Sequence, residues 1–247
     1  MIATSGSLRE TAESVARQIV GVDHTSARSL IWTPLTFPSG SFVGVRLTNG
    51  GGTYSLSDMA MSYEETRNVR AQRAFNRHAP KLAEESGVDF DKRSFLLSGI
   101  EREQLPGAVI TLANCALSAV TLAVHKQSVL DAKESERRLF ERLQRLFGHA
   151  EEHRIITGAS GTDWDVDASV MVHGRQVLFE AVGSSKQSIY AAVAKYHDIA
   201  RLPEAPVRIA SVSKREELGS MLGVLSQAAS VIEASTPDDT VMRLVAA

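Results

Sequence analysis

Residues 154–182 have the sequence RIITGASGTDWDVDASVMVHGRQVLFEAV, which predicts three consecutive β-strands. Arg154–Thr157, Asp163–Val172 and Gln176–Val182 are rich in β-branched and aromatic residues, and glycine-containing turns separate them. The turn at His173-Gly174 is short, so the second and third strands should form an antiparallel hairpin.

Helices and a fourth strand are expected on either side of this run. Apolar residues recur at helical spacing over 135–147 and again over 186–200. Pro206 precedes a further strand, Val207–Val212. We therefore predict one mixed sheet with both helices packed against it.

The N-terminal region has a different pattern. Ser7 and Glu10 have capping-box spacing, which predicts a helix over residues 8–20. Alternating residues 41–47, a glycine-rich turn and residues 53–56 predict a hairpin. Residues 63–79 are typical of a helix that Pro80 should break or restart.

A nearly uncharged segment, Ala108–Val124, follows Pro106. Its length is below the roughly 20 apolar residues of a membrane span, and it carries Asn114 and Ser118. We interpret it as a helix that protein must cover on all sides.

These patterns together predict an α/β (α+β) fold with two modules. The small N-terminal α/β module should occupy residues 1–100, and a connecting apolar helix 101–131. A C-terminal module of order αβββαβ should occupy residues 132–235. A loose tail over 236–247 should end the chain.

Composition excludes several functions. The 27 Lys and Arg residues against 29 Asp and Glu leave a formal net charge of −2, without the broad positive field of a dedicated duplex-DNA binder. A single cysteine, Cys115, excludes an internal disulfide framework and a cysteine-based zinc cluster. No secretory signal is recognisable, so a cytoplasmic location is expected.

Four arginines recur at helical spacing within the predicted helix over 63–79. They are Arg67, Arg70, Arg73 and Arg77. Such a stripe could contact phosphates, and it is equally typical of a solvated helix face.

The order of elements from Ser135 to Val212 resembles the core of the restriction-endonuclease-like superfamily of metal-dependent nucleases. Its pattern implies an acid on the second strand, here Asp167, and an acid-x-lysine motif on the third, here Glu180. These two carboxylates would bind Mg²⁺. Val182 stands where the family has lysine, and Lys186 is the candidate substitute.

A second resemblance covers residues 25–65. Thr33-Pro34, the hairpin, and Ser57-Asp58 before a helix resemble uncharacterised two-domain proteins of prophages and other mobile elements. The glycine that usually comes soon after the aspartate is absent, and Met59-Ala60-Met61 follows Asp58. This resemblance implies a genetic neighbourhood in which many proteins counter host defence systems.

Because the lysine is missing, the sequence favours a non-enzymatic binding protein of a phage or mobile element. Such a protein would inhibit a host protein or ribonucleoprotein defence complex, as anti-CRISPR or anti-restriction proteins do, and needs no cofactor. The alternatives are a Mg²⁺-dependent nuclease using Asp167, Glu180 and Lys186, and a nucleic-acid-binding regulator using the arginine stripe. The partner, the stoichiometry and any homo-oligomer remain open, and no membrane partner is expected.

Overall fold

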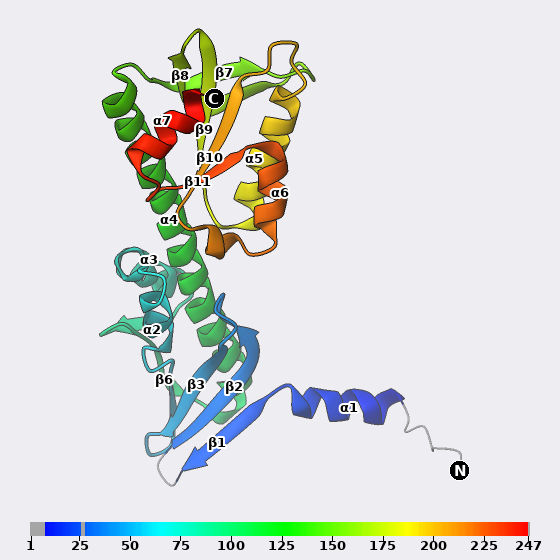
Figure 1. Cartoon of the computed structure of the whole chain (residues 1–247). Helices are drawn as coiled ribbons and strands as arrows, with labels where there is room; N and C mark the ends of the chain where they lie inside the picture. Colours follow the sequence, from blue (N-terminus) through cyan, green and yellow to red (C-terminus); the bar gives the residue numbers. More distant parts are fainter. Residues whose placement is uncertain (1–7, 26–27, 247) are drawn as a thin grey trace, which may run out of the picture. The chain divides into compact units, whose positions relative to one another are not determined.

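The computed structural model describes residues 8–25 and 28–246, and its chain divides into two compact units at Val129 and Leu130 (Figure 1). Both helices and sheets are present, in an α+β arrangement with one sheet in each unit. Ser7 of the predicted capping box lies outside the described residues.

The N-terminal unit is built on a sheet with the order β1-β2-β3-β4-β6-β5, in which all neighbours are antiparallel. The predicted hairpin is confirmed as β3 and β4, and the predicted first helix as α1. The elements are α1 (Leu8–Gln18), β1 (Gly21–Thr25), β2 (Arg28–Thr36), β3 (Phe42–Asn49), β4 (Tyr54–Ser57), α2 (Met61–Arg67), α3 (Gln72–Glu85), β5 (Asp89–Asp91), β6 (Ser94–Ile100) and the 3₁₀ turn Arg102–Gln104.

Asp58 is the polar centre of this unit. Its fully buried carboxylate accepts hydrogen bonds from the backbone N–H groups of Ala60, Ser62 and Phe95, at 3.2, 3.2 and 2.8 Å, and from the Ser62 hydroxyl. Burial raises the pKa of Asp58 despite these bonds. The aspartate of the Ser57-Asp58 pattern therefore ties β4, α2 and β6 together.

The two residues after Asp58 adopt left-handed backbone conformations, with φ of 55° at Met59 and 59° at Ala60. Glycine is the residue that adopts such φ values without steric cost. Ala60→Gly should therefore raise the free energy of unfolding by about 0.5–1 kcal/mol in urea titrations. Ala83→Gly, in a regular helix, should lower it by about 1 kcal/mol or more. Loss of stability in Ala60→Gly would contradict the argument.

The helix predicted over 63–79 is two helices. α2 ends at Arg67, and Arg70 has φ of 56° in the turn before α3. The arginine stripe is thus divided between two helices and a turn, although all four side chains are exposed. The predicted break at Pro80 is wrong, because α3 continues through it to Glu85. Packing of the buried Phe75, Ala79 and Ala83 outweighs the hydrogen bond that proline removes.

The apolar segment belongs to α4 (Leu105–Phe147), one helix of 43 residues where two were expected. Residues 131–134 contain no glycine or proline to end it. The expectation of cover on all sides is also wrong. One face is exposed and carries small and polar residues at alternating spacings of four and three: Gly107, Thr111, Asn114, Ser118 and Thr121.

Among the described residues, one helix, Arg102–Phe147, is long and apolar enough to cross a membrane. In the structure, 39% of its apolar window is buried. Leu112, Ala116 and Val120 pack in the core with Val43, Val45, Phe75 and Phe95. Core helices of soluble proteins have the same composition, so this feature alone does not identify a membrane protein.

The predicted mixed sheet of the C-terminal unit is confirmed. Its order is β11-β10-β9-β8-β7, with β7, β8 and β9 antiparallel and β9, β10 and β11 parallel. The elements after α4 are β7 (Glu151–Thr157), β8 (Asp163–Val172), β9 (Arg175–Val182), α5 (Lys186–Ile199), β10 (Val207–Val212), the 3₁₀ turn Arg215–Leu218, α6 (Met221–Ala228), β11 (Ser230–Glu233) and α7 (Asp238–Ala246).

Helices cover both faces of this sheet. Leu178 packs with the buried residues of α5 and α6, whereas its neighbours Val177 and Phe179 pack with the end of α4 and with α7. The predicted loose tail is wrong, because residues 238–246 form α7 and bury Val241 and Val245. The Asp238 carboxylate forms an ion pair with Arg142 of α4, with 2.7 Å between Asp238 Oδ1 and Arg142 Nη2.

Candidate functional site

The two predicted acids, Asp167 and Glu180, lie on neighbouring strands. The β8–β9 register pairs Ala168 with Phe179, and the regular pairing stops there. The next position along each strand holds Asp167 and Glu180. Because the pairing has stopped, the Asp167 carboxylate accepts the backbone N–H of Ala181 at 2.7 Å. The hairpin thus brings both carboxylates together, as predicted from their spacing.

A lysine does reach Glu180, and it is Lys195 of α5. Its ammonium donates to Glu180 Oε1 at 2.5 Å and also to the backbone oxygen of Asp165. Both side chains are largely buried, with exposed fractions of 12% for Lys195 and 14% for Glu180. The premise that this site lacks a lysine is therefore wrong.

Lys186, the substitute expected from the sequence, is the first residue of α5 and is exposed. The sequence does contain a signal for Lys195. The sheet-facing stripe of α5 includes Ala192 and Ile199, and Lys195 falls between them at helical spacing. A lysine within a buried stripe indicates an internal partner, because an unpaired buried ammonium is costly.

Burial changes the acidity of both carboxyl groups. It raises the pKa of Glu180 to about 7, and the negative charge of Asp167 adds to this while Lys195 opposes it. Burial also raises the pKa of Asp167, against the hydrogen bond from Ala181. With both carboxyl groups ionised, the pair would carry one more negative charge than Lys195 neutralises.

Further acidic groups and one histidine surround this pair. His153 of β7, whose φ is 52°, contacts Glu136 Oε1 of α4 at 3.1 Å and Asp165 Oδ2 at 3.2 Å. The charges of Glu136 and Asp165 raise the pKa of Asp167, so both lie near it. These carboxylates raise the pKa of His153, outweighing burial, which lowers it. Sequence spacing gave no reason to group these residues.

The donor set fits a hard divalent cation. Glu180 Oε2 is buried, and no described residue gives it a hydrogen bond. A buried carboxylate oxygen without a partner is costly, and Mg²⁺ prefers oxygen ligands from carboxylates. Asp167 and Glu180 are the residues that would hold the ion, beside the ammonium of Lys195.

Comparison with protein-family models, with curated proteins and with solved structures finds no match to this chain, so no family is assigned to it on that basis.

Proposed function

We propose that the C-terminal unit is a divalent-cation-dependent nuclease that hydrolyses phosphodiester bonds. The observation that carries this proposal is the contact of Lys195 Nζ with Glu180 Oε1, beside Asp167. An acid pair with a lysine supplies the three roles that the nuclease pattern requires, although the lysine comes from α5 rather than β9. The order of α4, β7, β8, β9, α5 and β10 adds support through the resemblance to the restriction-endonuclease-like core.

The chemistry of each side chain suggests its role in hydrolysis. When bound, a divalent cation supplies Lewis-acid stabilisation of the charge that develops on the phosphate. Asp167 and Glu180 would hold it through carboxylate oxygens. Lys195 fixes the Glu180 carboxylate with one N–H and binds the Asp165 carbonyl with another. Its third N–H can donate to an attacking water or to a phosphate oxygen.

Exposed side chains lie next to the acid pair. The side chains of Asp165 and His153 are each 56% exposed, so the buried acid pair lies next to open surface. The proposed substrate is nucleic acid, and a cytoplasmic location accords with it. The alternative, that the protein inhibits a host defence complex, stays a prediction. No contact among the described residues favours it over the nuclease.

The decisive experiment is cleavage of labelled single- and double-stranded DNA and RNA by the purified full chain with Mg²⁺ or Mn²⁺. We expect cleavage of at least one substrate, abolished by a chelator. Glu180→Gln and Asp167→Asn should each lower its rate about 10³-fold or more, because each removes an anionic ligand. Glu204→Gln, at an exposed loop position, is the matched control and should keep the full rate.

A protein that cleaves none of these substrates with either cation would refute the nuclease. If Glu180→Gln cleaves as fast as the unaltered chain, the site around Glu180 is not the site of cleavage. A specific complex recovered with host proteins, unaffected by Asp167→Asn and Glu180→Gln, would instead support the binding hypothesis.

A further inference from the structure

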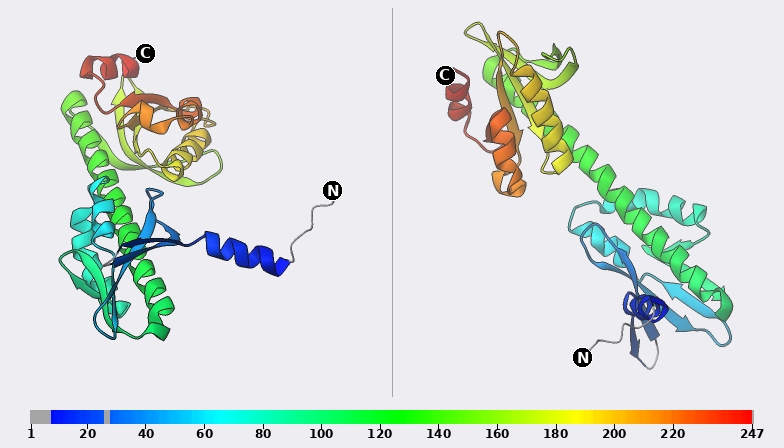
Figure 2. Two further views of the ribbon diagram at one scale, coloured as in Figure 1. Left: turned by 90° about the horizontal axis from the view of Figure 1, so that it is seen from below. Right: turned by 90° about the vertical axis from the view of Figure 1, so that its right-hand side faces the viewer.

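The N-terminal helix α1 buries none of its described side chains. All described side chains of this 11-residue helix are exposed. Figure 1 and the left view of Figure 2 draw α1 projecting from the sheet of its unit. Isolated helices of this length are marginal in water, and most helices in proteins are stabilised by packing an apolar face. Packing of its apolar face against a partner would therefore stabilise α1.

The face that needs the partner is regular. Leu8, Ala12, Val15 and Ile19 follow one another at spacings of four, three and four residues, the pattern of a helix that packs along a single seam. Leu8 is 86% exposed, Val15 52% and Ile19 53%. The charged residues Glu10, Glu13 and Arg17 lie off this stripe.

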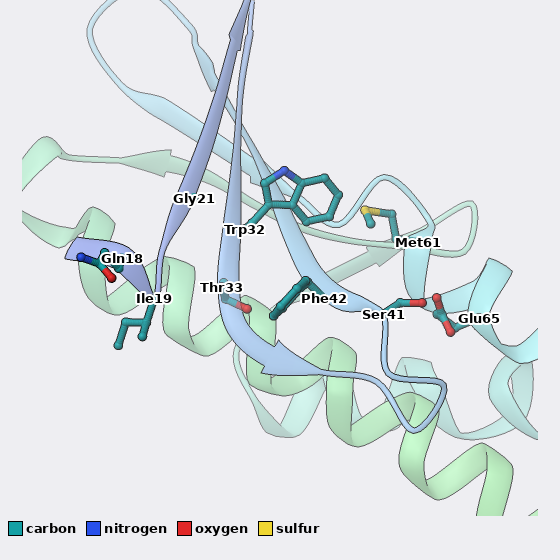
Figure 3. A pocket seen from close by; sticks show the side chains of 9 residues that line it. All are labelled: Gln18, Ile19, Gly21, Trp32, Thr33, Ser41, Phe42, Met61 and Glu65. Atoms are coloured by element: carbon teal, nitrogen blue, oxygen red, sulfur yellow. The ribbon is translucent and has the colours of Figure 1, made fainter. Parts of the chain in front are cut away.

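A cavity of about 620 Å³ opens next to the end of α1 (Figure 3). Trp32, Phe42 and Met61 provide its apolar side chains, Ile19 and Thr33 also line it, and Glu65 adds a carboxylate. Its Trp32 wall is fixed by a hydrogen bond of 2.6 Å from the indole N–H to Asp23 Oδ2. Phe42 is 56% exposed at the cavity, so this wall too lacks a partner.

A glycine maintains the shape of this cavity. A Cβ at Gly44 would lie 2.9 Å from the Trp32 ring and 3.2 Å from the Met61 sulfur. Any side chain at position 44 would therefore displace both walls. The pocket is consequently a formed feature of the unit, with a shape that the β3 backbone permits.

We propose that the occupant is α1 of a second copy of this chain, in a reciprocal dimer. Residues at the end of α1 line the rim of the pocket of their own copy, so stripe and pocket lie side by side on one surface. A two-fold axis at that rim would place each stripe on the pocket of the other copy. Such an isologous contact is self-complementary and closed.

The exposed apolar area fits a weak, reversible contact. Five apolar side chains beside the pocket are more than 40% exposed: Leu8, Val15, Ile19, Val20 and Phe42. At roughly 100 Å² for each fully exposed side chain, they offer about 290 Å² per copy. Homodimer interfaces are about 65% apolar, so the whole interface would bury roughly 900 Å² over both copies. That is the size of a weak, transient interface, so the dimer should form only as concentration rises.

The test is the mass of the full chain across a concentration series, measured by sedimentation equilibrium. We expect a dimer, and Val15→Glu should raise its dissociation constant about tenfold or more, because it places a charge in the seam. Ser14→Glu adds the same charge outside the stripe and should leave the constant unchanged. Both positions are exposed in the single copy, so both variants should keep the fold of the rest of the chain, and Val15→Glu should lose at most the helical circular dichroism of α1.

Cross-linking tests the reciprocal geometry. A Val15→Cys variant mixed with a Phe42→Cys variant should form a disulfide-linked pair on mild oxidation, because α1 of one copy meets the pocket of the other. The native Cys115 is only 3% exposed and should not react. A monomer at all concentrations, a dimer insensitive to Val15→Glu, or a dimer in which positions 15 and 42 of the two variants do not cross-link would each overturn the proposal.

Discussion

Lys195→Ala is expected to lower cation-dependent cleavage about 10²–10³-fold, whereas Lys186→Ala should leave the rate within about twofold of the unaltered chain. The two variants remove the same functional group from one helix. Lys195 is buried on Glu180, and Lys186 is exposed at the start of α5. Loss of a donor aimed at developing charge in a water-poor site typically costs this much. The measurement is the initial cleavage rate at saturating Mg²⁺.

Two controls make this comparison specific. Thermal unfolding of both variants separates loss of chemistry from loss of fold, since Lys195→Ala leaves the buried Glu180 without its ion pair. Lys195→Arg retains the positive charge on a wider group, so an intermediate rate is expected. Equal rates for Lys195→Ala and the unaltered chain would show that this lysine has no part in the reaction.

The stability of the cation-free protein should fall by about 3 kcal/mol, relative to Glu180→Gln, as pH rises from about 4 to 8. The pKa of Glu180 is about 7 in the folded chain and 4.5 in the reference state. Between these values the folded state binds the proton and the unfolded state does not. The stabilising contribution of protonation is thus complete below pH 4.5 and is lost as pH rises through 7. A difference of 2.5 pKa units corresponds to this energy.

Urea unfolding with a chelator, at several pH values, measures the effect. The unaltered chain and Glu180→Gln share all other titrating groups, so the difference between their unfolding free energies reports Glu180 together with its coupling to Asp167. Added Mg²⁺ should restore part of the stability of the unaltered chain at pH 8 and little in Glu180→Gln, because a ligand that binds the folded state stabilises it. Parallel pH profiles for the two proteins would contradict the raised pKa of Glu180.

Local patterns predicted the C-terminal sheet correctly. The alternation over residues 154–182 and the tight turn at His173-Gly174 depend on neighbours in sequence, and β7, β8 and β9 formed as expected. Asp167 and Glu180 are close because a two-strand hairpin relates them. Patterns failed where packing decided the outcome, as at Pro80 within α3 and at Val241 and Val245 of α7.

The sequence by itself determined the strand order through the hairpin, the acid pair within it, and the amphipathic stripe of α1. Only the tertiary structure decided that Lys195 meets Glu180 and that His153 joins Glu136 to Asp165. The same holds for the exposure of the α1 stripe beside a pocket. Residues within one hairpin are related by a fixed register. Residues on separate elements become neighbours only through the packing of helices against the sheet, which depends on many side chains at once.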